Sequence, residues 1–516
     1  MMELSKIKSH LGPLSYILIM AVLGVPIWWR TTEVYRALLP YDAIDALSDI
    51  EYVTQKVNII LITPDAQGVH SRGPEVQKLL NSQLYDLSLN VRAPSERESK
   101  VLESAVSLGD VDEEIGKGLA GSVPGAVVLL EAPRVLLVSP SSLVAGNYRT
   151  IYFTSATPSQ QIAAMLMDTV LGEQQMSRLW ETPSSPASSP TSASLLRKKS
   201  TGKIDVQLSL LVPEPEYVVA SWDIKGAVHK YLDPFLSRFP LHVPVNSQVI
   251  YLTSLNIPGG EEGQGPLEVK AEDLALALNS VESLLSSQSS SSPALNLIIY
   301  IPPVHRTPLT VRGSKNNSFL IPSWGGVYIY NYNLPGDKMI KYPTSLELDM
   351  ELVSKIWVGQ LRSLLGVQVV DERKSLALNP RGLRDWELDY QLRYRAGENI
   401  VEVRRTLESL SRLLHQIPNI VITEDIARRV EMSLNKLRMS VSYLKEGRIT
   451  EAHSASQSSL QQAEAAFFDP SLLSLLYFPD DQKYAIYVPY FLPVGLPILL
   501  SIKSIIKAIK TKPKEE

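Results

Sequence analysis

The sequence predicts an α/β body, made of two α/β lobes and a following helical segment, flanked by two transmembrane helices. Three observations predict this architecture. Two runs of nineteen residues without a charge, 11–29 and 484–502, lie near the two ends of the chain. Between them, strand-like apolar runs alternate with helical patterns as far as residue 382. From residue 383 to residue 468 only helical patterns occur.

The second uncharged run has the length that a helix needs to cross a bilayer, about 20 residues. It contains Pro489, Pro493 and Pro497, which are spaced by four and fall on or near one face of a helix. Each proline leaves a carbonyl without its helical partner, so in lipid we expect this face to turn towards protein or a polar cavity. A buried helix of a soluble protein is the alternative, and three prolines disfavour it because each would break such a helix.

The first uncharged run, residues 11–29, is either a cleaved signal peptide or a retained anchor. It is longer than a typical signal core, and it ends in Trp28, Trp29 and Arg30. Tryptophans followed by a basic residue are typical of the membrane interface, whereas a cleavage site needs small residues. We therefore interpret this run as a retained signal anchor.

Charges outside the two runs predict the orientation. Lys6 and Lys8 precede the first run, and five lysines follow the second. The positive-inside rule then places residues 1–10 and the basic tail, 503–516, in the cytosol. Residues 30–483 lie on the far side of the membrane, which we take to be the lumen of the endoplasmic reticulum (ER). The tail is interpreted as a stop-transfer charge cluster, although its spacing also fits a short amphipathic helix at the membrane surface.

Composition divides the lumenal body into four parts. A stretch rich in serine and proline, residues 183–200, cannot bury a core and is predicted to be a linker or loop between two α/β lobes, 30–182 and 201–382. Residues 383–483 form the predicted helical lumenal segment. Strands are expected at Val57–Thr63, Ala126–Glu131, Val135–Ser139, Thr150–Thr154, Ile204–Val212, Gln248–Leu255, Leu295–Ile301 and Gly326–Tyr332. Helices are expected near Pro74–Gln83, Glu96–Ser107, Ser159–Trp180, Asp223–Leu236, Ala271–Leu285, Leu346–Leu365, Glu402–Gln416, Ile426–Leu444 and Thr450–Phe467.

Composition also excludes several classes of function. A formal net charge of −4 and the lack of a basic stripe with interleaved aromatics argue against nucleic acid as a partner. The chain has no cysteine, which excludes disulfides, thiolate metal sites and a cysteine nucleophile. We find no sequence signature of a zinc hydrolase, a serine hydrolase or a phosphate-binding loop, and Gly116-Lys117-Gly118 is interpreted as a turn. No catalytic residue, cofactor or metal ligand is therefore predicted.

Three weaker candidates remain. The seven histidines, such as His70, His229 and His305, lack the spacing of metal ligands. An acidic cluster, Asp110 with Asp112–Glu114, offers oxygen ligands that calcium prefers, but its spacing departs from a calcium-binding loop and we interpret it as a solvated loop. Asp65 follows a predicted buried strand, where α/β folds bind ligands, but capping of a helix explains it equally well.

One modification motif is present, Asn316-Asn317-Ser318. Because the predicted topology places it in the lumen, Asn316 is a candidate for N-linked glycosylation.

Several stretches resemble one family, PIG-S, the S subunit of the glycosylphosphatidylinositol (GPI) transamidase. The similarity extends over the whole chain except for about residues 87–201. The blocks that carry it are GVPIWWRTTEVYRALLPY (24–41), WDIKGAVHKYLDPFL (222–236), LNLIIYIPP (295–303), SWGGVYIYN (323–331), ELDMELVSKIWVGQLRSLLG (347–366) and AFFDPSLLSLLYFPDDQKYAIYVPYFLPVGLPILLS (466–501).

The resemblance implies an ER membrane protein with two spans and a large lumenal domain. The family's complex removes a C-terminal signal from a precursor protein and joins the new carboxyl end to the ethanolamine amine of a GPI lipid. The resemblance implies that the PIG-K subunit carries the cysteine-protease chemistry, and that this chain is a non-catalytic partner of PIG-K, PIG-T, PIG-U and the Gaa-type subunit. ER membrane lipid, including GPI, is the other implied partner.

We expect the Pro489, Pro493 and Pro497 face to pack against other spans or to border the lipid-substrate cavity. Kinking of a lone anchor is the alternative. For the whole chain, two other functions stay open: an independent membrane-anchored lumenal scaffold without a role in GPI attachment, and a lumenal hydrolase or transferase that uses Asp65 or a histidine.

Overall fold

The structure is a computed structural model. It describes residues 15, 18–24, 26–27, 30, 35–64, 66–122, 125–137, 142–181, 203–239, 243–255, 267–270, 273, 276, 293–332, 343–367, 372–378, 382–417, 420–474, 485, 488–489, 492–493, 495–500 and 502–503. The chain divides into two compact units. Unit 1 comprises Met1–Leu47, Arg404–Leu434 and Gln462–Glu516, and unit 2 comprises Ser48–Val403 and Asn435–Gln461.

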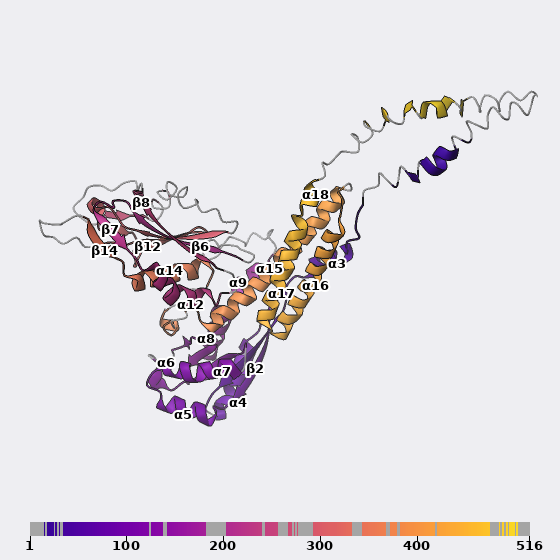
Figure 1. Ribbon diagram of the computed structural model, residues 1–516. Coiled ribbons are helices and arrows are strands. Elements are labelled where there is room, and N and C mark those ends of the chain that lie inside the picture. Colours follow the sequence, from indigo (N-terminus) through magenta and orange to yellow (C-terminus); the bar gives the residue numbers. More distant parts are fainter. Residues whose placement is uncertain are drawn as a thin grey trace, which may run out of the picture. The chain divides into compact units, whose positions relative to one another are not determined.

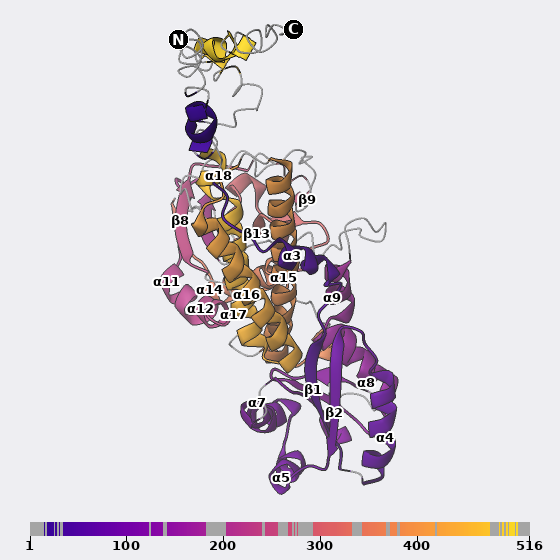
Figure 2. The same ribbon diagram turned by 90° about the vertical axis from the view of Figure 1, so that its right-hand side faces the viewer.

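Within the described part of unit 2, an N-terminal sheet has five strands in the order β2-β1-β3-β5-β4. All pairs are parallel except β4 with β5. Helices cover both faces, with α4 and α8 on one side and α5 and α7 on the other (Figure 2). This cover explains why the second half of β1, from Ile59 to Ile62, and β3 up to Leu130 are continuous apolar runs, as is usual for parallel strands. The strands are β1 (Gln55–Ile62), β2 (Tyr85–Arg92), β3 (Val127–Glu131), β4 (Val144–Ala145) and β5 (Thr150–Phe153).

A second described sheet of unit 2 has five strands in the order β12-β13-β10-β6-β8, and only β12 is antiparallel (Figure 1). All eight residues of β6 are buried, because α12 and α14 pack on one face of the sheet and β9 and β11 on the other. The strands are β6 (Asp205–Val212), β8 (Val245–Tyr251), β10 (Ala294–Tyr300), β12 (Ser318–Ile321) and β13 (Gly325–Ile329). Two smaller pairs join β9 (Leu267–Val269) to β11 (Leu309–Val311) and β7 (Val218–Ser221) to β14 (Thr344–Glu347).

Helices connect the strands and then make up the C-terminal described part. They are α3 (Tyr41–Asp45), α4 (Ala66–Leu79), α5 (Glu96–Ser104), α6 (Leu108–Val111), η3 (Asp112–Gly116), α7 (Lys117–Ser122), α8 (Ser159–Ala164), η5 (Met165–Val170), α9 (Glu173–Trp180), α11 (Ile224–Ala227), η6 (Val228–Leu232), α12 (Asp233–Leu236), α14 (Met350–Leu364), α15 (Asp385–Gln416), α16 (Glu424–Glu446), α17 (Ile449–Phe467) and α18 (Pro470–Ser474). The α/β body with a C-terminal helical segment is therefore as the sequence predicts.

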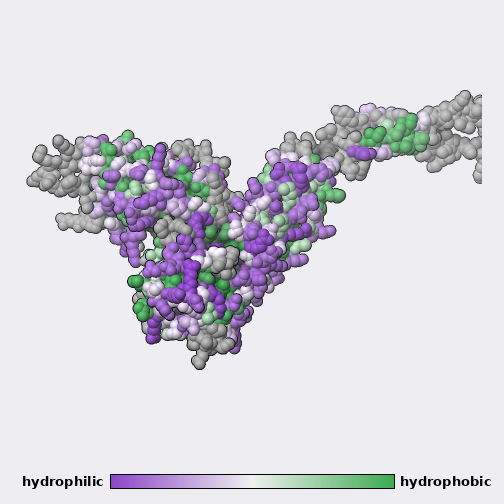
Figure 3. Space-filling view, turned by 60° about the horizontal axis from the view of Figure 1, so that its bottom comes forward, coloured by the Kyte–Doolittle hydropathy of each residue, from purple (hydrophilic) through white to green (hydrophobic). Residues whose placement is uncertain are grey.

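The surface is mostly polar and the interior is apolar. Hydrophilic residues cover most of the described surface in the view of Figure 3, with smaller hydrophobic areas between them. The large apolar side chains gather instead around the two sheets, where Trp357, Tyr152 and Phe235 are fully buried. Burial of such side chains is the main stabilising contribution to a fold of this kind.

Several predicted elements differ from the structure. The predicted strand Val135–Ser139 is wrong: after Pro133 the chain makes a single 3₁₀ turn, Arg134–Leu136, and the side chain of Val135 is exposed. The helix predicted over Leu346–Leu365 begins only at Met350, because Asp349 caps it: the Asp349 carboxylate accepts hydrogen bonds from the amides of the next turn.

Two further differences concern length and continuity. The predicted helix Ser159–Trp180 is interrupted at Gly172, which has φ +59°, a conformation that glycine adopts at little cost. The predicted helix Glu402–Gln416 is the end of a helix twice as long, α15, which begins at Asp385.

Among the described residues, no helix combines the length and apolarity needed to cross a bilayer. Nine of the nineteen residues of the predicted span 11–29 and seven of the nineteen of the predicted span 484–502 lie outside the described residues. The predicted linker 183–200, Asp65 and most of the predicted helix Ala271–Leu285 lie outside them too.

Candidate functional site

The first turns of α15, within unit 2, are buried on nearly every side although they are rich in charge. Arg384, Asp385, Glu387 and Asp389 are each less than a tenth exposed. A helix of a water-soluble body normally turns its charged residues to solvent, and a buried charge is tolerated only when it is paired and hydrogen-bonded. We call these residues and their partners the ionic junction.

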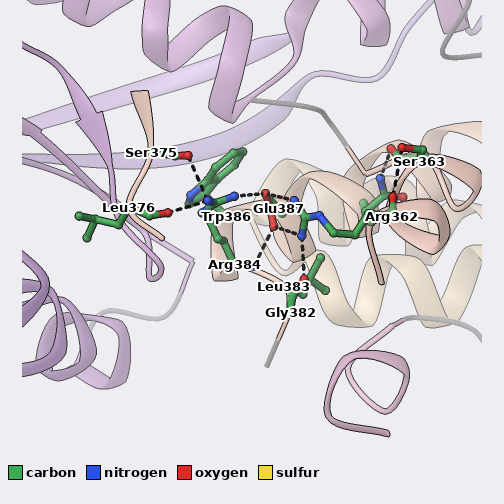
Figure 4. A network of polar contacts seen from close by, with 12 residues as sticks. Arg362, Ser363, Ser375, Leu376, Gly382, Leu383, Arg384, Trp386 and Glu387 are labelled. Carbon is green, nitrogen blue, oxygen red and sulfur yellow. Dashed lines mark hydrogen bonds and ion pairs between the residues drawn. The ribbon is translucent and has the colours of Figure 1, made fainter. Parts of the chain in front are cut away.

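Glu387 is the centre of the ionic junction (Figure 4). Its side chain is 1% exposed and accepts two hydrogen bonds from the guanidinium of Arg362, at 2.7 and 3.0 Å. It accepts two more from Arg384, one from the side chain at 2.7 Å and one from the backbone amide at 2.8 Å. Since Arg362 lies on α14 and Arg384 directly precedes α15, one carboxylate joins the second sheet's helix layer to the helical segment.

Arg384 extends the junction to the first sheet. Its guanidinium also donates to Ser375 Oγ at 3.0 Å and to the carbonyl of Leu376 at 2.7 Å. The amide of Leu376 in turn donates to the carbonyl of Ala145 on β4 at 2.9 Å, and Ala145 and Ser375 form an isolated β-bridge. The edge of the first sheet is thereby connected to the start of α15.

Two further ion pairs anchor α15. Arg149, just before β5, makes a two-pronged contact with the carboxylate of Asp389 on α15. Burial by itself would lower the pKa of Arg149, but the hydrogen bonds and charge of Asp389 outweigh it and raise that pKa. On the other side, Arg238 binds the Asp385 carboxylate and donates to the carbonyl of Leu383 at 2.8 Å. Such two-pronged arginine–carboxylate pairs fix orientation as well as distance.

The first sheet also supplies the cap of α15. The carbonyl of Asn147 accepts a hydrogen bond from the amide of Asp385 at 2.9 Å, and the carbonyl of Gly146 accepts one from Trp386 Nε1 at 3.0 Å. The first amides of a helix have no partner inside the helix. Here a turn of the first lobe provides the partner, so the start of α15 depends on that turn.

Asp112 holds this turn in place. Its carboxylate accepts hydrogen bonds from the Asn147 amide at 2.6 Å, from Thr150 Oγ1 at 2.6 Å and from Tyr152 Oη at 2.8 Å. Burial raises the pKa of Asp112, and the three hydrogen bonds oppose that rise. The predicted solvated loop is thus wrong for Asp112, which is 1% exposed.

The rest of the acidic cluster is local. The carboxylate of Asp110 accepts hydrogen bonds from the amide and hydroxyl of Ser107 at the start of α6, and Glu113 accepts one from the hydroxyl of Tyr148 at 3.0 Å. Among the described residues, no group of acidic residues and histidines is arranged to hold a metal ion.

The geometry of the ionic junction is suited to holding elements of the fold together rather than to catalysis. Each of its central carboxylates is engaged by arginines, so none is presented to a substrate in the described geometry. Buried ion pairs add little net stability, because desolvation offsets their attraction, but breaking one costs several kcal/mol and they favour one arrangement over others. The junction therefore fixes how both sheets meet the start of α15.

A second connection lies within unit 1, between the N-terminal segment and the α15–α16 loop. Arg36 and Ile422 form a β-bridge, in which the amide of Ala37 donates to the carbonyl of Ile422 at 2.9 Å. The guanidinium of Arg36 also donates to the carbonyl of Leu414 at 2.8 Å. The residues that follow the first predicted span are thereby attached to the helical segment that leads to the second.

Comparison with known proteins finds matches over nearly the whole length of the chain. Residues 15–512 match the family model PIG-S, described as phosphatidylinositol-glycan biosynthesis class S protein. The chain belongs to the PIG-S family. Its relatives include the GPI-anchor transamidase components PIGS of Bos taurus, 32% identical over 97% of this chain and 95% of the relative, and of Homo sapiens, 31% identical over 96% and 95%. A GPI transamidase component PIG-S homolog from Schizosaccharomyces pombe is 26% identical over 97% of this chain and 83% of that protein.

The residues singled out from the sequence of this PIG-S family member belong to different units, with Pro489, Pro493 and Pro497 in unit 1 and Asn316 in unit 2. Pro489, Pro493 and Pro497 are helical and exposed. Asn316 is exposed in a turn of unit 2 between β11 and β12. None of these residues takes part in the ionic junction.

The histidines are likewise dispersed. His229 is exposed on η6, and His305 lies 3.6 Å from the carboxylate of Glu214 at the surface. His453, on α17, is buried, and this burial lowers its pKa to about 4.

Sequence patterns missed the ionic junction because its members look like solvated residues. The stretch from Asp385 to Arg395 alternates polar and apolar residues, a period-two pattern that is typical of a half-exposed strand and does not indicate a buried helix. Its partners are distant in sequence: Asp389 pairs with a residue 240 positions away. The one local signal was the family block at 347–366, which contains Arg362.

Proposed function

We infer that the chain is a component of the GPI-anchor transamidase. The match of residues 15–512 to the PIG-S family carries this inference, since it leaves no large part of the chain outside the family. The match to the relatives that are named as this component covers 95% of the length of each relative. A function as an independent scaffold has no comparable support.

Within that complex we assign the chain a non-catalytic role. It has no cysteine, so it cannot supply the thiolate of a cysteine-protease subunit. The ionic junction supports a role in assembly, because it connects both sheets of unit 2 to the start of α15 at a single point. A buried network of this kind suits a protein that positions other subunits, for which PIG-K, PIG-T, PIG-U and the Gaa-type subunit are the candidates.

The proposed topology is an ER membrane protein with two spans, residues 11–29 and 484–502, and with both termini in the cytosol. The lumenal body then consists of two lobes, 30–182 and 201–382, and the helical part 383–483. Two uncharged runs of spanning length support this topology. The bridge between Arg36 and Ile422 supports it further, because it gives the N-terminal anchor a fixed attachment to the helical part.

A complementation experiment tests the proposed function. Deletion of the chain's gene in its own cells, or in cells that lack the family member, should abolish the display of a GPI-anchored reporter, and the full chain should restore it. Normal display of the reporter after deletion would favour the independent scaffold. Turnover of a peptide substrate by the purified full chain alone would contradict the non-catalytic role.

We further propose that Pro489, Pro493 and Pro497 form a face that packs against other spans or borders the lipid-substrate cavity. The spacing of four, which puts the three prolines on or near one face of a helix, supports this proposal. Replacing the three prolines by leucine should reduce both co-purification of other subunits and GPI attachment. A matched triple change to alanine at Leu492, Leu496 and Leu500, on neighbouring positions, controls for general damage to the span. Unchanged assembly and attachment in the proline variant would contradict the proposal.

A further inference from the structure

The 516 residues contain a single Asn-x-Ser/Thr sequence, Asn316-Asn317-Ser318. It lies in unit 2, in the turn between β11 and β12, and Ser318 is the first residue of β12. Lys315 and Asn316 are exposed in this turn, and so is Gly313. An acceptor for an N-linked glycan must lie on such a surface turn, because the folded domain has to accommodate a bulky oligosaccharide.

The two neighbouring asparagines have different roles. Asn317 is fixed: it adopts φ +52°, and its side-chain amide donates to the carbonyls of Leu309 at 2.9 Å and Ile329 at 3.0 Å. Its side-chain oxygen accepts a hydrogen bond from the amide of Val311 at 2.8 Å. Asn317 therefore holds the turn against β11 and β13, and it tolerates the positive φ better than most residues would.

The two groups that N-glycosylation uses are unoccupied by contrast. In the described part of the chain, the side-chain amide of Asn316 and the hydroxyl of Ser318 take part in no hydrogen bond. Only the backbone of Ser318 is engaged, through its amide and carbonyl with Ser314 Oγ at 3.0 and 2.7 Å. The turn is thus stabilised by Ser314 and Asn317, and a substituent on Asn316 displaces no contact.

We propose that Asn316 carries an N-linked oligosaccharide. The side-chain nitrogen of Asn316 loses a proton and forms a bond to the anomeric carbon of the oligosaccharide's first sugar. The bond between that carbon and a lipid-linked diphosphate, the donor class that the ER lumen supplies, breaks, and the diphosphate leaves with the bonding electrons. The proposal rests on the lumenal placement of the body given under Proposed function.

A glycan at this position also restricts how the complex is assembled. An oligosaccharide on Asn316 covers the turn from Arg312 to Asn317, so no partner subunit can pack on that surface. The edge strand β12 follows immediately, and a hydrated glycan beside it hinders pairing with another strand. This turn therefore stays exposed to the lumen in the assembled transamidase.

Digestion with an N-glycan-specific amidase tests the proposal on the full chain produced in eukaryotic cells. The native chain should migrate faster after digestion by the mass of one oligosaccharide. Asn316→Gln and Ser318→Ala should each abolish the shift, whereas Ser318→Thr, which keeps the acceptor sequence, should retain it. Asn90→Gln, which changes an exposed asparagine outside any acceptor sequence, is the matched control and should retain the shift too. A native chain that does not shift overturns the proposal.

A second variant separates failure of the glycan from failure of the topology. Gln83→Thr creates an acceptor sequence that begins at Asn81, which is exposed in the loop between α4 and β2. If this variant gains a glycan while the native chain has none, the body is lumenal and only the assignment of Asn316 is wrong. If neither chain carries a glycan, the assignment is overturned and the lumenal placement is contradicted as well. The digestion of the intact purified complex should also proceed without dissociating it, because the proposed glycan lies outside every subunit contact.

Discussion

Replacing Glu387 by glutamine removes one charge from the centre of the ionic junction while keeping the side chain's shape. The carboxylate accepts two hydrogen bonds from Arg362 and two from Arg384 among the described residues. Glutamine keeps one acceptor oxygen, but its NH₂ group faces donors that it cannot pair with. Two guanidinium groups are then left close together, and neither the 14% exposed Arg362 nor the 5% exposed Arg384 is open to much water.

The expected cost is about 3–5 kcal/mol, the range for removing one partner from a buried ion pair. Since each 1.4 kcal/mol is about tenfold in an equilibrium constant, local opening at the start of α15 should become about a hundredfold more frequent or more. Hydrogen exchange of the Asp385 and Leu388 amides, which donate to the carbonyls of Asn147 and Arg384, measures this directly on the full chain in detergent. Exchange is preferable to a single global unfolding curve, because a chain with several folded units does not unfold in one step.

A matched control uses an ion pair of the same kind at the surface. Glu351 accepts a hydrogen bond from Lys355 at 2.7 Å, but the two side chains are 57% and 67% exposed. Glu351→Gln should leave exchange at α15 unchanged, because exposed pairs contribute little. If Glu387→Gln also left the exchange rates at α15 within threefold of the native chain, the ionic junction would not be what holds this helix in place.

Two further predictions concern the same region. Gly146→Ala places a Cβ against Thr150 Oγ1 and the carboxylate of Asp112, at a cost of about 1–3 kcal/mol, and should therefore speed hydrogen exchange of the Asp385 amide, which donates to this turn. Gly118→Ala, with open space around its Cβ, should not, and equal exchange rates in the two variants would refute the tight packing of this turn. Burial lowers the pKa of His453 to about 4, against about 6.5 in the unfolded chain. The neutral ring therefore contributes stability above pH 6.5, and about 3 kcal/mol of this stability is lost as the pH falls towards 4. Stability measured from pH 7 to pH 4 should therefore fall less in His453→Gln than in the native chain, and parallel profiles would exclude the histidine as the cause.

Strands that are largely buried are among those that the sequence predicts correctly. Val57–Thr63 contains the apolar run IILI, and Ile204–Val212 alternates apolar with polar residues before it ends in LLV; they correspond to β1 and β6. The edge strand β2 was missed because its sequence, YDLSLNVR, mixes polar and apolar residues as a half-exposed strand does. The first part of α15 was missed because its charged residues look like solvated ones.

The candidate site lay beyond sequence reasoning because charge and burial conflict there. Asp112, Glu387 and Asp389 are stable in the interior only through arginines, hydroxyls and amides that the fold brings from other elements. Sequence patterns assign such residues to the solvent-exposed surface, because a charged residue without a buried partner stays exposed. Asn316 was predictable by its motif, but the difference between a free Asn316 and a structurally fixed Asn317 appears only in the folded turn.

Purification of the tagged full chain from membranes in mild detergent tests the central inference most directly. If the chain is a component of the GPI-anchor transamidase, a cysteine-protease subunit should co-purify with it in near-equal amount, together with other membrane subunits. Recovery of the chain alone, or with proteins that do not take part in GPI attachment, would contradict the account.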